Sequence, residues 1–229
     1  MINKLKLGFF KKTVVFWWMK ILRDSLLKIK YMDVFHTRCK IENHGTYSVN
    51  KHIKGGGKLY IGHGSMLDHV EIRIVGQNNS ISIGKGCYLG KRCSLWLEGN
   101  NISITIGDRC TFTHDTQLCA QEDNCRIEIG NDCMFSHHIN VRTSDSHLIF
   151  DTHIGERVNY PKNVIIGAHV WIAPEAKIMK GCTIGRGAII GSNTIVTKDI
   201  PPNSLAVGMP AKVVKSNGGF YQFHFLFLA

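Results

Sequence analysis

Apolar residues recur at every sixth position over most of this chain. From Ile61 onward the chain divides into six-residue units (hexads), with a few extra residues after every third unit. The first residue of each hexad, its start, is apolar in every case except one. The starts are Ile61, Leu67, Arg73, Ile83, Leu89, Leu95, Ile106, Phe112, Leu118, Ile129, Phe135, Val141 and, after a gap, Ile166, Ile172, Ile178, Ile184, Ile190 and Val196. A fixed period of this kind is the sequence signature of a repeat architecture.

Turn residues punctuate the repeat. Three hexads make 18 residues, yet the first coils advance by 22 or 23. The extra residues fall at or beside Asn78-Asn79, Asn100-Asn101 and Asp123-Asn124, whose residue types tolerate tight left-handed backbone. One six-residue side buries almost nothing alone, whereas sides stacked in register bury a continuous apolar column. The pattern therefore predicts a solenoid with three sides to each coil.

Five of the eight cysteines follow the same register. Cys87, Cys93, Cys110, Cys133 and Cys182 occupy the fifth place of a hexad, where other coils carry Val or Ala. No CxxC pair is present, so we expect these side chains to pack as small apolar residues rather than to form disulfides or a zinc site. This usage indicates a reducing compartment.

Four segments resemble the hexapeptide-repeat acyltransferases. They are residues 163–173 (NVIIGAHVWIA), 184–191 (IGRGAIIG), 196–203 (VTKDIPPN) and 208–212 (GMPAK). The stretches SDSH (144–147) and GERVN (155–159) are most similar to bacterial capsule and surface-polysaccharide O-acetyltransferases. The resemblance covers roughly residues 57–215. It implies an all-β fold, a left-handed parallel β-helix, acetyl-CoA as donor, a carbohydrate acceptor, and a homotrimer whose active site is shared between subunits.

The register breaks after Ser146 and resumes at Ile166, so residues 147–165 form an inserted loop. Insertions on a rigid scaffold are often functional. The first inserted residue is His147, and an alcohol needs a base before it attacks a thioester, a task that suits histidine. The family's catalytic histidine occupies this place. We therefore predict that His147 deprotonates a sugar hydroxyl for direct attack on acetyl-CoA; a solvated loop histidine is the alternative.

Neighbouring residues carry weaker predictions. Asp145 lies two residues before His147, and in an extended segment both side chains would project the same way, so Asp145 would orient the imidazole or contact the acceptor. A turn-forming aspartate is the alternative. His137 and His138 are adjacent, and we expect them to point to opposite faces of a strand. A structural role is favoured, and the alternative is that one of them lines the groove.

The resemblance also implies the donor site. It places Trp171 beside the thioester and the acceptor, Ser192, Thr197 and Lys198 along the pantetheine arm, and Lys212 and Lys215 near the nucleotide phosphates. A solvated cationic tail is the alternative for the last two. Pro174 departs from the family pattern, and because proline has no N–H, the oxyanion donor must come from elsewhere.

The amino-terminal segment differs in charge from the rest. The chain has a net charge of +11, and residues 1–30 hold eight Lys or Arg against Asp24 alone. Apolar residues there follow helical spacing, which predicts a basic amphipathic arm over residues 1–35 that contacts an anionic membrane surface or packs on its own trimer. We expect a β-helix domain over residues 36–215, a tail over 216–229, no nucleic-acid partner, and a cytoplasmic protein peripheral to the inner face of the membrane.

Three other functions remain open on the sequence. N-acetylation of an amino sugar nucleotide would use the same base. Twelve histidines also permit a zinc carbonic anhydrase of the β-helix type, which needs three converging histidines. A catalytically silent scaffold is the last alternative. The predicted acetyltransferase requires no metal.

Overall fold

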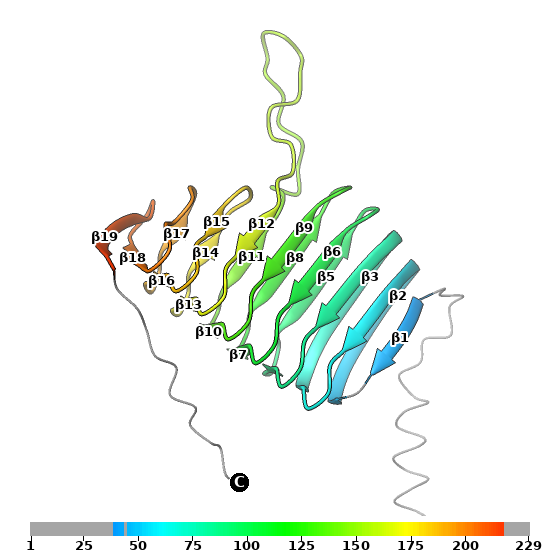
Figure 1. Cartoon of the computed structure of the whole chain (residues 1–229). Helices are drawn as coiled ribbons and strands as arrows, with labels where there is room; N and C mark the ends of the chain where they lie inside the picture. The colour runs from blue at the N-terminus through cyan, green and yellow to red at the C-terminus, as the bar shows by residue number, and fades with distance from the viewer. Residues whose placement is uncertain (1–38, 44, 218–229) are drawn as a thin grey trace, which may run out of the picture. The chain divides into compact units, whose positions relative to one another are not determined.

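The computed structural model describes residues 39–43 and 45–217, all within the second of two compact units, residues 35–229. Regular structure in these residues is entirely β-strand, and the strands stack as successive coils (Figure 1). The prediction of an all-β parallel β-helix is confirmed. The predicted helical arm and most of the predicted tail lie outside the described residues. Within the described part, no helix is long and apolar enough to cross a membrane.

Each coil contributes a short strand to each of three faces. Face 1 contains β4 (Tyr88–Leu89), β7 (Thr111–His114), β10 (Met134–His137), β13 (Trp171–Ile172), β16 (Ile189–Ile190) and β18 (Ser204–Val207). Face 2 contains β5 (Ser94–Glu98), β8 (Gln117–Gln121), β11 (Asn140–Arg142), β14 (Lys177–Ile178) and β17 (Ile195–Val196). Face 3 contains β6 (Ser103–Ile106), β9 (Arg126–Ile129), β12 (Val164–Ile166) and β15 (Thr183–Ile184).

The remaining strands lie at the two ends of the stack. They are β1 (Cys39–Asn43), β2 (Thr46–Ile61), β3 (Met66–Ile83) and β19 (Lys212–Ser216). Strand β3 pairs with one strand of each face, whereas β19 folds back antiparallel to β18. All other strand pairs between the described elements are parallel, as stacked coils require.

The apolar hexad starts form the core, as the period predicts. All of them are buried, and Phe112 and Phe135 stack inside with ring centroids 4.4 Å apart. The predicted start at Arg73 is wrong. Ile72 points inward instead, opposite Leu95, because the stretch from Leu67 is one residue shorter than a hexad. Arg73 therefore points outward, with its guanidinium 4.8 Å from the centroid of the Trp96 ring.

The cysteine prediction is also confirmed. The five register cysteines are buried and free, and the thiols of Cys87, Cys110 and Cys133 donate hydrogen bonds to backbone carbonyl groups of the following coil. Burial raises the pKa of the Cys93 thiol to about 11. All five side chains are buried in the apolar column, so they act as packing groups rather than as nucleophiles.

Asparagines turn the corner between faces 2 and 3. Asn78, Asn101 and Asn124 all have positive φ, and their amides form a ladder with hydrogen bonds of 3.3 and 3.1 Å. The predicted insertion leaves the stack at this same corner, between β11 and β12, and protrudes as a hairpin (Figure 1). Phe150 and Arg157 form an antiparallel bridge within it. The β-helix resumes at Val164, one residue before the predicted end of the loop.

Candidate active site

His147 lies at the base of the hairpin, five residues after β11 ends. Its side chain is exposed, and its backbone carbonyl accepts a hydrogen bond of 2.7 Å from the Asn159 amide. Asn159, on the returning strand of the hairpin, thus fixes the backbone of His147 while the imidazole stays accessible to other molecules. A base that must meet an external hydroxyl needs that accessibility.

Asn159 closes the base of the hairpin. This residue is 7% exposed, and its Nδ2 also donates to the Asp145 carboxylate at 2.9 Å. Its Oδ1 accepts a hydrogen bond of 2.8 Å from the backbone N–H of Ile149. One side chain therefore joins the outgoing and returning strands of the hairpin on both sides of His147.

Asp145 is held by a cation from the next coil. The Lys180 ammonium lies 2.6 Å from Asp145 Oδ2, and this contact holds the pKa of the Asp145 carboxyl below its usual range. Ser146, between Asp145 and His147, has a φ of 65°, so the segment is not extended as the sequence argument assumed. Among the described contacts, the Asp145 carboxylate meets Lys180 and Asn159 rather than the His147 imidazole.

A second ion pair ties the hairpin to face 2. Arg157 Nη2 lies 2.6 Å from Glu122 Oε2, and the guanidinium also covers the Tyr160 ring at 5.0 Å. Glu122 in turn accepts a short hydrogen bond from the buried Ser144 hydroxyl. The sequence gives no signal for these pairs, because their partners lie 35 residues apart in each case, on separate coils or across the hairpin.

Trp171 begins an apolar row along face 1. Strand register aligns Trp171 with Ile189, Ile189 with Leu205, and Leu205 with Lys215. Three strand spacings make this row about 14 Å long. Between the indole of Trp171 and the exposed ammonium of Lys215 lie two half-buried aliphatic side chains. Lys212 lies on β19, the strand that carries Lys215. The structure thus places three of the predicted donor-site residues on one face.

The other predicted donor-site residues lie elsewhere. Thr197 and Lys198 follow β17 at the end of face 2, and Lys198 lies one coil beyond Lys180 in the same register. Ser192 lies at the corner between faces 1 and 2. All three side chains are exposed. Within the described residues, no ion pair engages Lys198, Lys212 or Lys215.

The predicted site therefore divides into two groups within one chain. His147, Thr197 and Lys198 lie where face 2 ends, whereas Trp171 and Lys215 lie on face 1. Strands that form different sides of a coil cannot turn their outward side chains toward each other. One chain alone does not bring the imidazole to the indole.

A groove hollows face 2 between these two groups. It has a volume of about 520 Å³, and its lining combines polar, charged and apolar side chains: Asp115, Gln117, His138, Ile139, Asn140, Arg142, Lys177, Met179 and Ile195. Asn140 donates to Gln117 at 3.0 Å and accepts from Arg142 at 2.9 Å. Amide and guanidinium groups of this kind bind hydroxyl and carboxylate groups.

The expectation for His137 and His138 is wrong. Strand β10 ends at His137, and His138 turns the corner with a φ of 56°. The two rings therefore lie near each other, with centroids 5.3 Å apart, instead of on opposite faces.

Comparisons with known proteins agree with this architecture. Residues 163–198 match the family model of the bacterial transferase hexapeptide (six repeats). The solved structure of the polysialic acid O-acetyltransferase OatWY superimposes with a TM-score of 0.69 at 26% identity, covering 84% of this chain and 92% of that one. The polySia-specific acetyltransferase NeuO gives a TM-score of 0.52 with the same identity and coverage. This likeness supports the left-handed sense of the β-helix.

Curated relatives match over shorter segments. The polysialic acid O-acetyltransferase of Escherichia coli O1:K1 is 42% identical over 77 residues, 34% of this chain. A chloramphenicol acetyltransferase of Klebsiella aerogenes is 51% identical over 53 residues, 23% of this chain. The matched segment spans a quarter of the length of each of these relatives.

Proposed function

We propose that this protein, which carries the bacterial transferase hexapeptide repeat, is an O-acetyltransferase that moves an acetyl group from acetyl-CoA to a hydroxyl of a surface polysaccharide or its precursor. The observation that carries the proposal is an exposed histidine fixed at the base of a tethered hairpin, on a β-helix like those of two polysaccharide O-acetyltransferases. The names of the relatives support the reaction class and the acceptor class.

In the proposed reaction, His147 takes the proton of the acceptor hydroxyl through a ring nitrogen. The hydroxyl oxygen then bonds to the thioester carbonyl carbon, whose oxygen becomes a tetrahedral oxyanion. As the carbonyl reforms, the carbon–sulfur bond breaks and the imidazolium returns its proton to the leaving thiolate. The products are an acetyl ester and free CoA, and His147 ends in its starting state.

The acetyl-CoA site that we propose uses both groups of residues. The apolar row from Trp171 to Lys215 suits the thioester and the pantetheine arm, and its exposed ammonium suits a phosphate. Lys212 and Lys198 supply further cations, while Ser192 and Thr197 supply hydroxyl groups for the arm. Pro174 offers no N–H to the oxyanion, and its carbonyl already accepts from Asn193 N–H.

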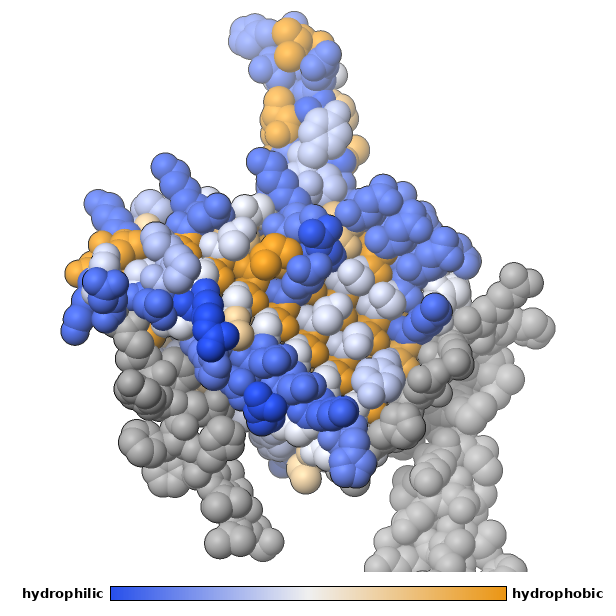
Figure 2. All heavy atoms as spheres, viewed as in Figure 1, coloured by the Kyte–Doolittle hydropathy of each residue, from blue (hydrophilic) through white to orange (hydrophobic). Residues whose placement is uncertain are grey.

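Two copies complete the site in this proposal. Face 1 of one copy packs beside face 2 of the next, so that Trp171 of one approaches His147 of the other, and closure of this contact gives a trimer. The hairpin supports such packing because Leu148, Ile154 and Tyr160 are each more than half exposed, at 59%, 66% and 59%. Figure 2 shows apolar side chains at the surface of the protruding hairpin.

The acceptor that we propose lies along the groove of face 2, near His147. Arg142 and Lys177 favour a sugar that carries a carboxylate. N-acetylation of an amino sugar nucleotide would use the same base. The two reactions differ in whether the acceptor is a hydroxyl or an amine. The proposed transfer requires no metal.

The test is transfer from labelled acetyl-CoA to a panel of acidic and neutral glycans, with NMR location of the new ester. His147→Ala should lower transfer by about two to four orders of magnitude while CoA binding and assembly stay unchanged. His153→Ala, in the same hairpin, is the matched control and should leave transfer intact. Full transfer by His147→Ala would rule out His147 as the base. Acetylation of an amine would favour the N-acetyltransferase.

A further inference from the structure

Three imidazole rings gather at the corner between faces 1 and 2, beside the groove to which the acceptor is assigned. Register aligns His114 with His137 on adjacent coils, and their ring centroids lie 5.0 Å apart. The His138 ring lies 5.7 Å from His114 and 5.3 Å from His137. Stacking of the coils therefore brings together side chains that are 23 residues apart in sequence.

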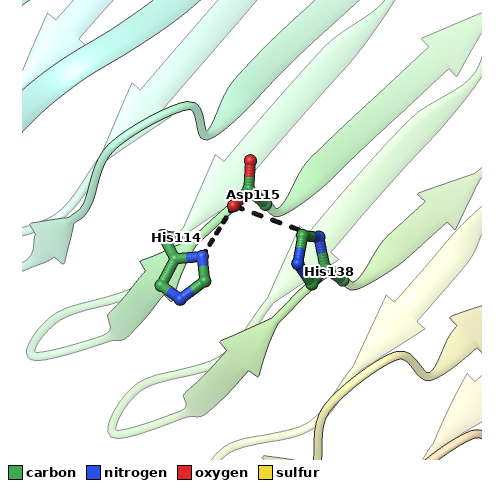
Figure 3. Close-up of side chains that lie close together, drawn as sticks. All are labelled: His114, Asp115 and His138. Atoms are coloured by element: carbon green, nitrogen blue, oxygen red, sulfur yellow. Dashed lines mark hydrogen bonds and ion pairs between the residues drawn. The ribbon is translucent and has the colours of Figure 1, made fainter.

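A carboxylate orients one of these rings. Asp115 Oδ2 lies 2.7 Å from Nδ1 of His114 and 4.0 Å from Nδ1 of His138 (Figure 3). Arg92 donates two hydrogen bonds of 2.6 Å to the same carboxylate, which keeps Asp115 ionised. An ionised carboxylate only accepts, so Nδ1 of His114 carries the hydrogen and Nε2 keeps a free lone pair. Metal-binding histidines usually have this arrangement.

We propose that His114, His137 and His138 of one chain bind a divalent transition-metal ion of the zinc type, with Asp115 as the orienting carboxylate. Zinc–nitrogen bonds of about 2.0–2.1 Å in a tetrahedral site hold three ring centroids about 5 Å apart. The donor atoms of His114, Asp115 and His138 already lie within 4.8 Å of one another, and His137 joins them once its stacked ring turns. Arg92 and Asp115 cancel in charge, so the ion meets no net positive charge at this corner.

The cluster has the room that coordination requires. The rings of His114 and His137 are nearly parallel, at 12°, so binding turns one of them about its side-chain bonds. The His114 and His138 side chains are 37% and 56% exposed, and His138 borders the groove of face 2. In the single chain, water can therefore reach the fourth position. The bound ion would join the ends of β7 and β10 and stabilise the stack.

A second cluster provides a matched control. At the corner between faces 3 and 1, Arg109 pairs with Asp132 at 2.6 Å, and Nε2 of His169 lies 3.7 Å from the same carboxylate. The arginine, the carboxylate and an imidazole are repeated there. Only one imidazole of the described residues joins that cluster, so it lacks the ligands for a tight site.

The test is calorimetric titration of the full-length, tag-free protein with zinc chloride after removal of metals by a chelator. We expect one ion per chain. His114→Ala and His138→Ala should each weaken binding about tenfold or more, and Asp115→Asn by about 10- to 100-fold. His169→Ala should bind as the unaltered protein does. Zinc should raise the melting temperature of the unaltered protein but not that of His138→Ala.

Cobalt(II) gives a readout that does not depend on how well a variant folds. Bound to the unaltered protein, it should show the intense visible absorption of four-coordinate nitrogen ligation. Unchanged zinc affinity in the His114→Ala, His138→Ala double variant would overturn the proposal. So would a stoichiometry of one ion per three chains, or a cobalt spectrum like that of the aqueous ion. None of these outcomes depends on acetyl transfer.

Discussion

Replacing Asn159 by alanine tests how the base of the hairpin fixes His147. The substitution removes the donor to the His147 carbonyl, at 2.7 Å, and the acceptor for Ile149 N–H, at 2.8 Å. An unsatisfied buried polar group costs about 1–3 kcal/mol, and water reaches part of this site, so we take about 2 kcal/mol for the pair. If that energy holds His147 in its working position, kcat should fall about 30-fold.

The assay combines steady-state transfer with amide hydrogen exchange of the peptide that contains residues 145–151. We expect faster exchange there, a lower kcat and an unchanged affinity for CoA. Asn163→Ala is the control, because Asn163 Oδ1 accepts Arg126 N–H at 3.0 Å and does not contact His147. A kcat within about twofold of the original, with faster exchange, would refute the link between Asn159 and the base.

Three further predictions concern stability and donor binding. Phe135→Ala removes the partner that stacks on Phe112 and should lower the free energy of unfolding by about 3–5 kcal/mol in denaturant titrations. Arg92 lowers the pKa of Asp115 in the folded protein, so this pair stabilises above the carboxyl's unfolded pKa and its contribution fades as the pH falls through the acid range. Arg92→Met should therefore unfold more readily than the original at pH 7, with the difference in melting temperature shrinking toward pH 2; a constant difference would contradict this. Lys198→Ala should weaken CoA binding in calorimetry, and an unchanged affinity would remove Lys198 from the donor site.

The sequence predicts the stack well because its period is a local property. Each apolar start must point inward for the coil to close, so spacing alone identifies the core. Arg73 shows the limit of that reasoning: a turn one residue shorter moves Ile72 inward, and the hexad count cannot detect the missing residue. At a corner, successive side chains no longer alternate between the two faces of a strand, and the rings of His137 and His138 therefore lie close together.

The base of the hairpin could not be predicted in the same way. The broken register indicates His147, but the partners of Asp145 depend on how the hairpin folds back. Lys180 comes from the next coil and Asn159 from the returning strand. No periodicity links these positions. The place of Lys215 at the end of the row from Trp171 was similarly hidden, because the antiparallel return of β19 brings it there.

The most direct test of a site shared between copies is complementation between two defective proteins. His147→Ala and Trp171→Ala are coexpressed in equal amounts with different tags, and mixed trimers are isolated. If each site takes His147 from one copy and Trp171 from its neighbour, one of the three sites in every mixed trimer regains both residues, and transfer recovers to about a third. Transfer no greater than that of the two separate variants would contradict the shared site.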